Sequence, residues 1–167
     1  MTLGELNDSM ARFRANPLAA QTAPAVTATL AGGQGRLTGG PFAWEVDLPP
    51  VVGGGNGAPS PTLYLLGALA GCAVAFIHDT LAPQLGVRLA GVTATARCRS
   101  DLRGLLGMDG GDPRLTGLSV EITVDSPDSP EQVEALRQAW LQRCPIYLAL
   151  LNPVPVEVSW LDGNGAE

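Results

Sequence analysis

The sequence predicts an α+β fold built as a single domain of 167 residues. Three observations lead to this expectation: short stretches in which apolar and polar residues alternate, a long apolar helix in the middle of the chain, and an amphipathic helix near the C-terminal end. Apolar residues make up 46% of the sequence and charged residues 16%, a composition typical of a folded globular chain. The expected order of elements is helix, two strands, long helix, two strands, helix and strand.

The first 24 residues are predicted to lie outside the core. Residues 2–15 have the pattern of a short amphipathic helix, and a loop rich in alanine and proline follows it. The core is expected to span residues 25–160, which leaves residues 161–167 as a tail. We therefore interpret residues 1–167 as one domain.

Two half-buried strands are expected in the first part of the core, at residues 25–30 and 42–48. Apolar side chains alternate there with threonine or charged residues, as they do in strands with one face covered. The glycine-rich residues 31–40 between them are predicted to be a turn region. Residues 49–61 have the composition of a flexible loop.

A long apolar helix is expected from Thr62 to about Leu85. Ser60 and Pro61 are residue types that begin helices, and Gly86 is a residue type that ends them. The helix is apolar on nearly every side. Something must therefore cover it, either a sheet wrapped around it or a second subunit.

Two further strands are predicted at residues 87–100 and 114–125, joined by the glycine-rich connection 101–113. Each strand alternates, so that one face is apolar and points inward. The inward residues are expected to be Val92, Ala94, Ala96 and Cys98 on the first strand, and Leu118, Val120, Ile122 and Val124 on the second.

The chain is expected to end with a helix and a strand. Ser129, Pro130 and Gln132 form the pattern of a capping box at a helix start. The inward face of this helix is predicted to carry Val133, Leu136, Trp140 and Cys144, and the final strand Val154, Val156, Val158 and Trp160.

Charge and composition argue against several functional classes. The net charge of -6 and the absence of a basic cluster argue against a nucleic-acid partner. The uncharged run from Leu63 to Ile77 is shorter than a membrane span, so we expect no membrane partner. The opening "MTLGELNDSM" does not have the pattern of a signal peptide, and we therefore expect a cytoplasmic protein. Neither a metal nor a cofactor is expected, because CxxC, Cys/His and GxGxxG spacings are absent.

The three cysteines differ in their sequence contexts. Cys98 falls on the inward phase of a strand, which favours a simple core residue. Cys72 lies in the middle of the apolar helix, where burial raises the pKa of a thiol, so a reactive Cys72 would need a nearby cation or base. His78, the only histidine, lies about 240° further round this helix and does not share a face with Cys72.

Cys144 directly precedes Pro145, which suits the first position of a short helix, "PIYLALL". At the N-cap of that helix a sulfur would face unpaired N–H groups and the positive end of the dipole, both of which favour the thiolate. Cys144 also ends the apolar face of the preceding helix. Packing and reactivity therefore explain this cysteine equally well.

Two motifs together resemble the family of osmotically inducible protein C and organic hydroperoxide resistance proteins (OsmC/Ohr). They are "SPTLYLLGALAGC" and, after a pair of strands, "RCPIYLALLNPVPVEV"; the resemblance extends from about Ala25 to Trp160. It implies an OsmC-like fold in which antiparallel sheets from both subunits of an intertwined homodimer wrap around long central helices. Such a dimer would explain a helix that is apolar on every side.

The resemblance also implies a two-cysteine peroxidase that reduces organic, fatty-acid-type hydroperoxides. Cys72 matches the cysteine that attacks the peroxide, and Cys144 matches the resolving cysteine that forms a disulfide with it. A dithiol reductant would reset the pair. Catalytic members carry a glutamate at the position of Thr62 and an arginine at the first glycine-rich turn, where the nearest candidate in this sequence is Arg36.

These two departures define an alternative. A divergent OsmC-like protein with little peroxidase activity would bind an apolar ligand in the dimer pocket or use its cysteines for other thiol chemistry. Retention of both cysteines favours the peroxidase, whereas the changes at the glutamate and arginine positions favour the alternative.

Overall fold

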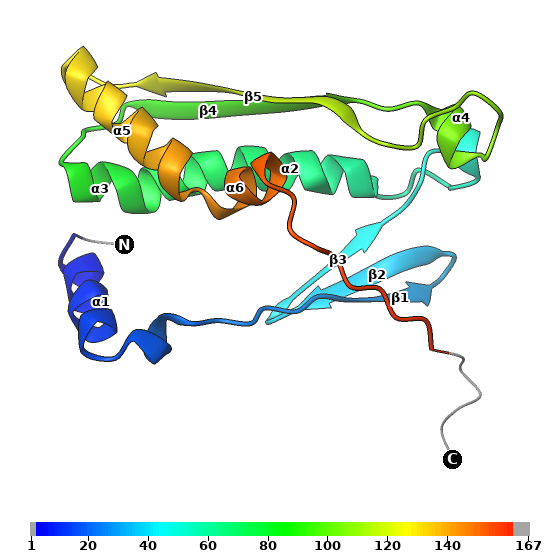
Figure 1. The fold of residues 1–167 in the computed structure, drawn as a ribbon, viewed down its shortest axis with the longest axis horizontal. Helices are drawn as coiled ribbons and strands as arrows, with labels where there is room; N and C mark the ends of the chain where they lie inside the picture. The colour runs from blue at the N-terminus through cyan, green and yellow to red at the C-terminus, as the bar shows by residue number, and fades with distance from the viewer. Residues whose placement is uncertain (1–2, 162–167) are drawn as a thin grey trace.

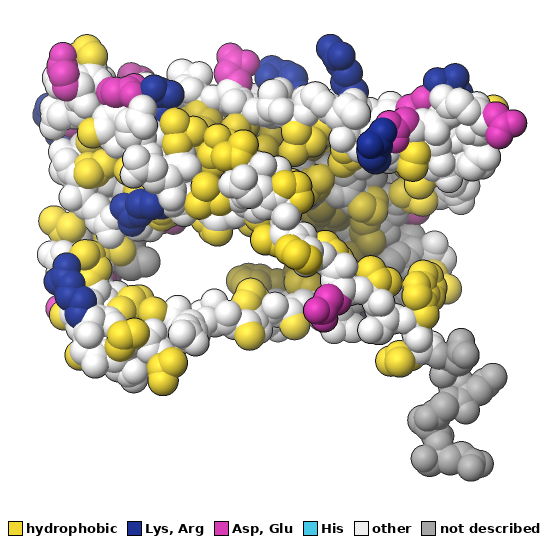
Figure 2. All heavy atoms as spheres, in the orientation of Figure 1, with side chains coloured by type: hydrophobic (Ala, Val, Ile, Leu, Met, Phe, Trp, Pro, Cys, Tyr) yellow, Lys and Arg dark blue, Asp and Glu magenta, His cyan; other side chains and the backbone are white. Residues whose placement is uncertain are grey.

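The computed structural model describes residues 3–161 and combines helices with antiparallel sheets, as the sequence predicts. Figure 1 shows a main body, in which helices pack along one face of the β4–β5 sheet, and an N-terminal arm that carries α1 and the β1–β3 sheet. Figure 2 shows an open gap between the arm and the body, with apolar side chains gathered on both sides of it.

The arm begins with α1 (Leu3–Ala15), in agreement with the predicted helix, and a short 3-10 turn (Pro17–Ala20). Its sheet has the order β1-β2-β3 and is antiparallel. The strands are β1 (Thr27–Ala31), β2 (Gln34–Gly39) and β3 (Phe42–Val46).

The prediction of a turn over residues 31–40 was wrong, because this stretch contains all of β2. The turn between β1 and β2 contains Gly32 and Gly33, which adopt φ of 60° and 85°. The glycines within β2 are held by pairing on both sides, and a side chain at Gly35 would collide with Val46 of β3. Close strand contact thus explains a glycine where composition alone indicated a turn.

The first strand is not half-buried within this chain. All of β1 is exposed, and the side chain of Leu30 is 84% exposed. The alternation that predicted a covered face is therefore not satisfied by any described part of the same chain.

The central helix is confirmed. It consists of α2 (Pro61–Phe76), a π-helical segment η3 (Ile77–Leu81) and α3 (Ala82–Leu85). The Ser60 hydroxyl accepts a hydrogen bond from the N–H of Leu63, and Gly86 ends the helix in the left-handed region. As a continuous element of 25 residues that contains an 18-residue window with a mean hydropathy of 1.7, it is long and apolar enough to cross a membrane, although core helices of soluble proteins share this property. The uncharged run from Leu63 to Ile77 alone therefore underestimated the apolar length of the central helix.

The second sheet contains β4 (Gly91–Arg99) and β5 (Thr116–Asp125), joined by a connection that includes the short helix α4 (Leu102–Leu105). The predicted inward residues of β4 are partly buried and alternate with exposed ones. On β5 the same holds from Val120 onward, whereas Leu118 is 37% exposed and lies near an irregularity in the strand register.

The C-terminal helix is confirmed as α5 (Pro130–Arg143), with the capping box between Ser129 and Gln132. A second helix, α6 (Pro145–Leu151), follows directly. Of the predicted inward face, Val133 is half-buried and the other three residues are buried. They join residues of the central helix in the core, whose buried members include Ala73, Ile77, Leu81, Leu136, Trp140 and Cys144.

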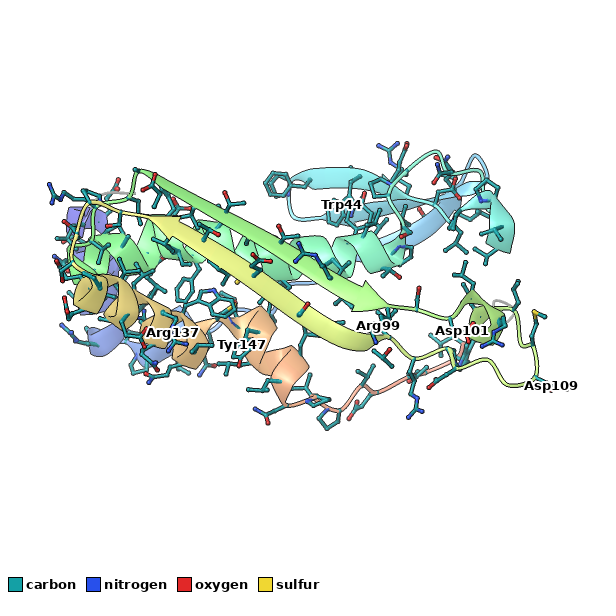
Figure 3. The ribbon with its side chains drawn as sticks, turned by 90° about the horizontal axis from the view of Figure 1, so that it is seen from above. Trp44, Arg99, Asp101, Asp109, Arg137 and Tyr147 are labelled. Atoms are coloured by element: carbon teal, nitrogen blue, oxygen red, sulfur yellow. The ribbon has the colours of Figure 1, made fainter. Side chains whose placement is uncertain are left out.

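The predicted final strand is not formed within this chain. Residues 154–160 are exposed and outside any strand, and Trp160 is 93% exposed. In Figure 1 this segment crosses in front of the β1–β3 sheet, but in Figure 3 the two lie on opposite sides of the body. A strand needs a neighbouring strand to satisfy its backbone groups, and no described segment of the chain takes that place.

Candidate functional site

The structure brings two of the predicted site residues together. Cys72 lies in the middle of α2, and Cys144 lies at the junction between α5 and α6. Their Sγ atoms are 3.2 Å apart, and both cysteines are free thiols. Cys144 reaches α2 because it is the last residue of the apolar face of α5, one turn after Trp140.

The thiol pair is buried to different degrees. Cys144 has no exposed surface, whereas Cys72 is only partly buried. Cys144 belongs to the buried apolar core, against which Cys72, Phe76 and Tyr147 pack. The ring centres of Trp140 and Tyr147 lie 5.0 Å apart in this cluster. A molecule coming from solvent would therefore meet Cys72 first.

Burial raises the pKa of the Cys72 thiol from 9.0 to about 11, and the neighbouring Cys144 thiol contributes in the same direction. The backbone N–H of Ile146 has the opposite effect, because it donates a hydrogen bond to the sulfur of Cys72. The neutral thiol is thus the dominant form of Cys72 at neutral pH.

The expected capping role of Cys144 needs a correction. Cys144 occupies the N-cap position of α6, but its side chain makes no capping hydrogen bond. Ile146, the second residue of α6, instead directs its N–H at Cys72. The start of α6, which the sequence predicted would favour a thiolate on Cys144, therefore acts on the sulfur of Cys72 instead.

The third predicted site residue, Arg36, lies away from the pair in this chain. It is exposed on β2, opposite Thr29 and Glu45 in the strand register. Within residues 3–161 no hydrogen bond or ion pair joins Arg36 to either cysteine. Thr62, at the start of α2, is separated from Cys72 by about 15 Å of helix.

The remaining candidates agree with their sequence interpretation. Cys98 is partly buried on the inward face of β4 and is not part of the thiol pair. His78 lies in the π-helical segment, where its Nδ1 is 2.7 Å from the carboxylate of Asp79, and both side chains are largely exposed. In the described part of the chain no three metal-binding side chains come together.

One contact near the pair was not predicted. Arg143, the residue before Cys144, places its guanidinium 5.5 Å from the centre of the Phe76 ring and donates a hydrogen bond to Gln84. Both partners lie on the central helix, so this arginine ties the α5–α6 junction to it. The only sequence signal was its position next to the cysteine.

A cavity of about 590 Å³ lies between β5, the central helix and the C-terminal helices. Its lining is mainly apolar and includes Leu69, Ile122, Trp140 and Tyr147. In Figure 3, Tyr147 and Arg137 lie on the side of β5 along which α5 and α6 run. Trp140 and Tyr147 also belong to the core cluster that includes Cys144, so the cavity borders the same cluster as the thiol pair.

Comparison with known proteins gives a consistent picture. A family model described as OsmC-like protein matches residues 53–159. An OsmC-like protein from Mycoplasma pneumoniae has a similar structure, with a TM-score of 0.66 and 18% identity over 80% of this chain and 90% of that one. No curated protein sequence matches this chain.

Two further similar structures are of organic hydroperoxide resistance proteins. The one from Legionella pneumophila has a TM-score of 0.58 and 18% identity, over 78% of this chain and 90% of its own. A putative one from Vibrio cholerae, with captopril bound in one of its active sites, has a TM-score of 0.56 and 22% identity, over 79% of this chain and 86% of its own. At these identities the likeness establishes the fold.

Proposed function

Since this chain belongs to the OsmC-like protein family, we propose that it is a thiol-dependent peroxidase that reduces organic, fatty-acid-type hydroperoxides. The observation that carries this proposal is the contact between the Cys72 and Cys144 sulfurs, which are 3.2 Å apart. A sulfenic acid formed on one sulfur would have a thiol beside it before a second peroxide arrived.

The proposed reaction has three steps. The thiolate of Cys72 attacks the terminal oxygen of the hydroperoxide, the O–O bond breaks, and the departing alkoxide takes a proton and leaves as the alcohol. Cys144 then attacks the Cys72 sulfenic acid, which forms the disulfide and releases water. A dithiol reductant returns both cysteines to thiols and is itself oxidised to a disulfide.

The surroundings of the thiol pair support an apolar substrate. Phe76, Trp140 and Tyr147 belong to the same core cluster as the two cysteines, and the cavity lined by Trp140 and Tyr147 has room for an acyl or aromatic group. Hydrogen peroxide could make no use of this surface, whereas an organic hydroperoxide would bury apolar area against it. The neighbours named for organic hydroperoxide resistance support the same class of substrate.

We propose that the active form is a homodimer, located in the cytoplasm. The small residues Gly67, Ala68 and Gly71 leave one side of α2 exposed, and the exposed segment 154–160 has the alternation of a strand without a partner. A second copy that covered these surfaces would also supply an Arg36 guanidinium from its own arm. A cation next to Cys72 would favour the thiolate that the raised pKa disfavours.

The raised pKa of Cys72 also favours the second candidate, a divergent family member with little peroxidase activity. No acidic or basic side chain hydrogen-bonds to Cys72 within residues 3–161. In that case the apolar cavity would hold a ligand, and the cysteines would serve other thiol chemistry.

One experiment separates the two candidates. The reduced protein is treated with one equivalent of cumene hydroperoxide, and intact mass and free thiols are measured. The peroxidase predicts the loss of two hydrogens and two thiols, abolished by Cys72→Ser and unaffected by Cys98→Ser, the matched control. Cys144→Ser should stop at a sulfenic acid that dimedone traps. Unreacted thiols in excess peroxide would reject the peroxidase and leave the ligand-binding candidate.

A further inference from the structure

Cys72 and Cys144 form a chelating dithiol whether or not the protein reduces peroxides. Their sulfurs are 3.2 Å apart and neither is in a disulfide. We propose that the pair is a binding site for trivalent arsenicals, with a preference for those that carry an apolar organic group. This site needs two reduced thiols and no oxidant, so it is independent of the proposed peroxidase activity.

The distance between the sulfurs selects the geometry of the bound centre. With bonds of about 2.3 Å, a length typical of thiolate ligands, two sulfurs 3.2 Å apart subtend an angle of about 90° at the bound atom. Trivalent arsenic is pyramidal and takes bond angles close to this value. A linear two-coordinate ion such as Cu(I) would need the sulfurs about 4.6 Å apart.

Zinc fits the site less well for two reasons. Tetrahedral coordination would need the sulfurs about 3.8 Å apart and two further ligands. No group of three His, Cys, Asp or Glu side chains able to hold a metal ion occurs among the residues that the structure describes. Trivalent arsenic, which needs only the two sulfurs and one substituent of its own, therefore fits the site better than zinc.

The environment favours an organic third substituent on arsenic. Phe76, Trp140 and Tyr147 are part of the cluster around the sulfurs, and the backbone N–H of Ile146 already donates to Cys72. A hydroxyl on arsenic would lose most of its hydration in this mainly apolar region, which is unfavourable. A methyl or phenyl group would instead bury apolar surface there.

The condensation with a trivalent arsenical needs only two thiols. An arsenical with two hydroxyls, R–As(OH)₂, condenses with two thiols: two As–O bonds break, two As–S bonds form, and each thiol proton leaves with a hydroxyl as water. Arsenic stays trivalent throughout, and no electrons are transferred. The neutral thiol that burial favours at Cys72 is therefore a form that this reaction consumes.

The unequal burial of the sulfurs sets the order of the two steps. Cys72 is partly exposed and Cys144 is not, so arsenic binds first to Cys72 and is then captured by Cys144. Loss of Cys144 should leave a weak adduct on one thiol. Loss of Cys72 should abolish binding at the pair, because the buried sulfur would be out of reach.

The test uses phenylarsine oxide and the full-length reduced protein, in the presence of excess glutathione. Intact mass should show one phenylarsenic group added with the loss of two thiols, and dithiothreitol should remove it. Cys144→Ser should bind at least about 100-fold more weakly, since the second contact is intramolecular. Cys98→Ser should bind like the wild type, and inorganic arsenite should bind more weakly than phenylarsine oxide.

Other outcomes would overturn the proposal. An adduct that survives Cys72→Ser, that is found on Cys98, or that forms equally well with Cys144→Ser would show that the pair does not chelate arsenic. Thermal unfolding of each variant confirms that it is folded before binding is compared. Failure of the peroxide assay with successful arsenical binding would reject the peroxidase alone.

Discussion

Replacing Cys144 by alanine should make Cys72 more reactive toward an alkylating agent, even though the change removes a thiol. Burial is the largest cause of the raised pKa of Cys72, and the Cys144 thiol is the next, through its hydrogen bond and its charge when ionised. Alanine removes both effects of Cys144 and also opens space for water beside the remaining sulfur. The N–H of Ile146, which favours the thiolate, is left in place.

The size of the effect follows from the pKa. At a pKa of about 11, roughly one Cys72 in ten thousand is a thiolate at about pH 7. Cys144 supplies two of the three causes that raise this pKa, so Cys144→Ala should raise the thiolate fraction about tenfold. Cys144→Ser keeps a hydrogen-bonding group but does not ionise in this range, and its effect should fall between those of the wild type and alanine.

The assay is the rate at which iodoacetamide modifies Cys72, measured by mass spectrometry of the Cys72 peptide over a range of pH. In the wild type the rate should rise about tenfold for each pH unit, without a plateau below about pH 9. Cys98→Ala is the matched control and should leave the Cys72 rate unchanged. If the wild-type rate reached a plateau below about pH 8, a group other than Cys144 and the Ile146 N–H would have to stabilise the Cys72 thiolate. An unchanged rate in Cys144→Ala would refute the conclusion that Cys144 raises the pKa of Cys72.

Three further predictions test the rest of the site and the fold. Arg36→Met should slow oxidation by cumene hydroperoxide about tenfold or more, whereas Arg97→Met should not; equal rates would remove Arg36 from the site. The amides of Gly57, Leu48 and Gly55 hold the pKa of Asp47 below 3.8, so its contribution to stability is present above this pH and is lost as the pH falls. Asp47→Asn should therefore be destabilised to urea at neutral pH, and its difference from the wild type should shrink as the pH falls below 3.8. Val156→Asp with Val158→Asp should convert the proposed homodimer to a monomer in light scattering; an unchanged mass would show that this segment does not hold the subunits together.

Periodicity predicted most of the elements because local contacts decide them. The Ser129 capping box and the Gly86 stop act within a few residues of sequence, and both are found as expected. The inward face of α5 follows in the same way from its spacing, down to the burial of Cys144. All the residues that these patterns bring into contact belong to the same chain.

The predictions that failed depend on distant partners. Glycine content suggested a turn at β2, but pairing with β1 and β3 made a strand of it. The alternation at residues 154–160 predicted a strand that this chain does not pair. A pattern of alternation states that a face should be covered, and it cannot state which chain covers it.

The site shows the same division between local and long-range information. The start of α6 could be recognised from Pro145, and with it the presence of free N–H groups that favour an anion. Which sulfur receives them depends on the packing of the α5–α6 junction against α2. Only the folded chain brings the N–H of Ile146 to Cys72 and leaves Cys144 without a capping bond.

The α5–α6 junction is also where the movement needed for a disulfide should occur. The sulfurs must approach by about 1.2 Å, from 3.2 Å to the length of an S–S bond of about 2.0 Å. Cys72 is held in the middle of a long helix, whereas Cys144 lies between two helices, where its N–H donates to the Trp140 carbonyl and its carbonyl accepts from the N–H of Leu148. Arg143 ties this junction to the central helix through Phe76 and Gln84, so closure of the disulfide must either carry that contact along or break it. Arg143, beside the proposed resolving cysteine, therefore resists or guides the displacement that the proposed chemistry requires.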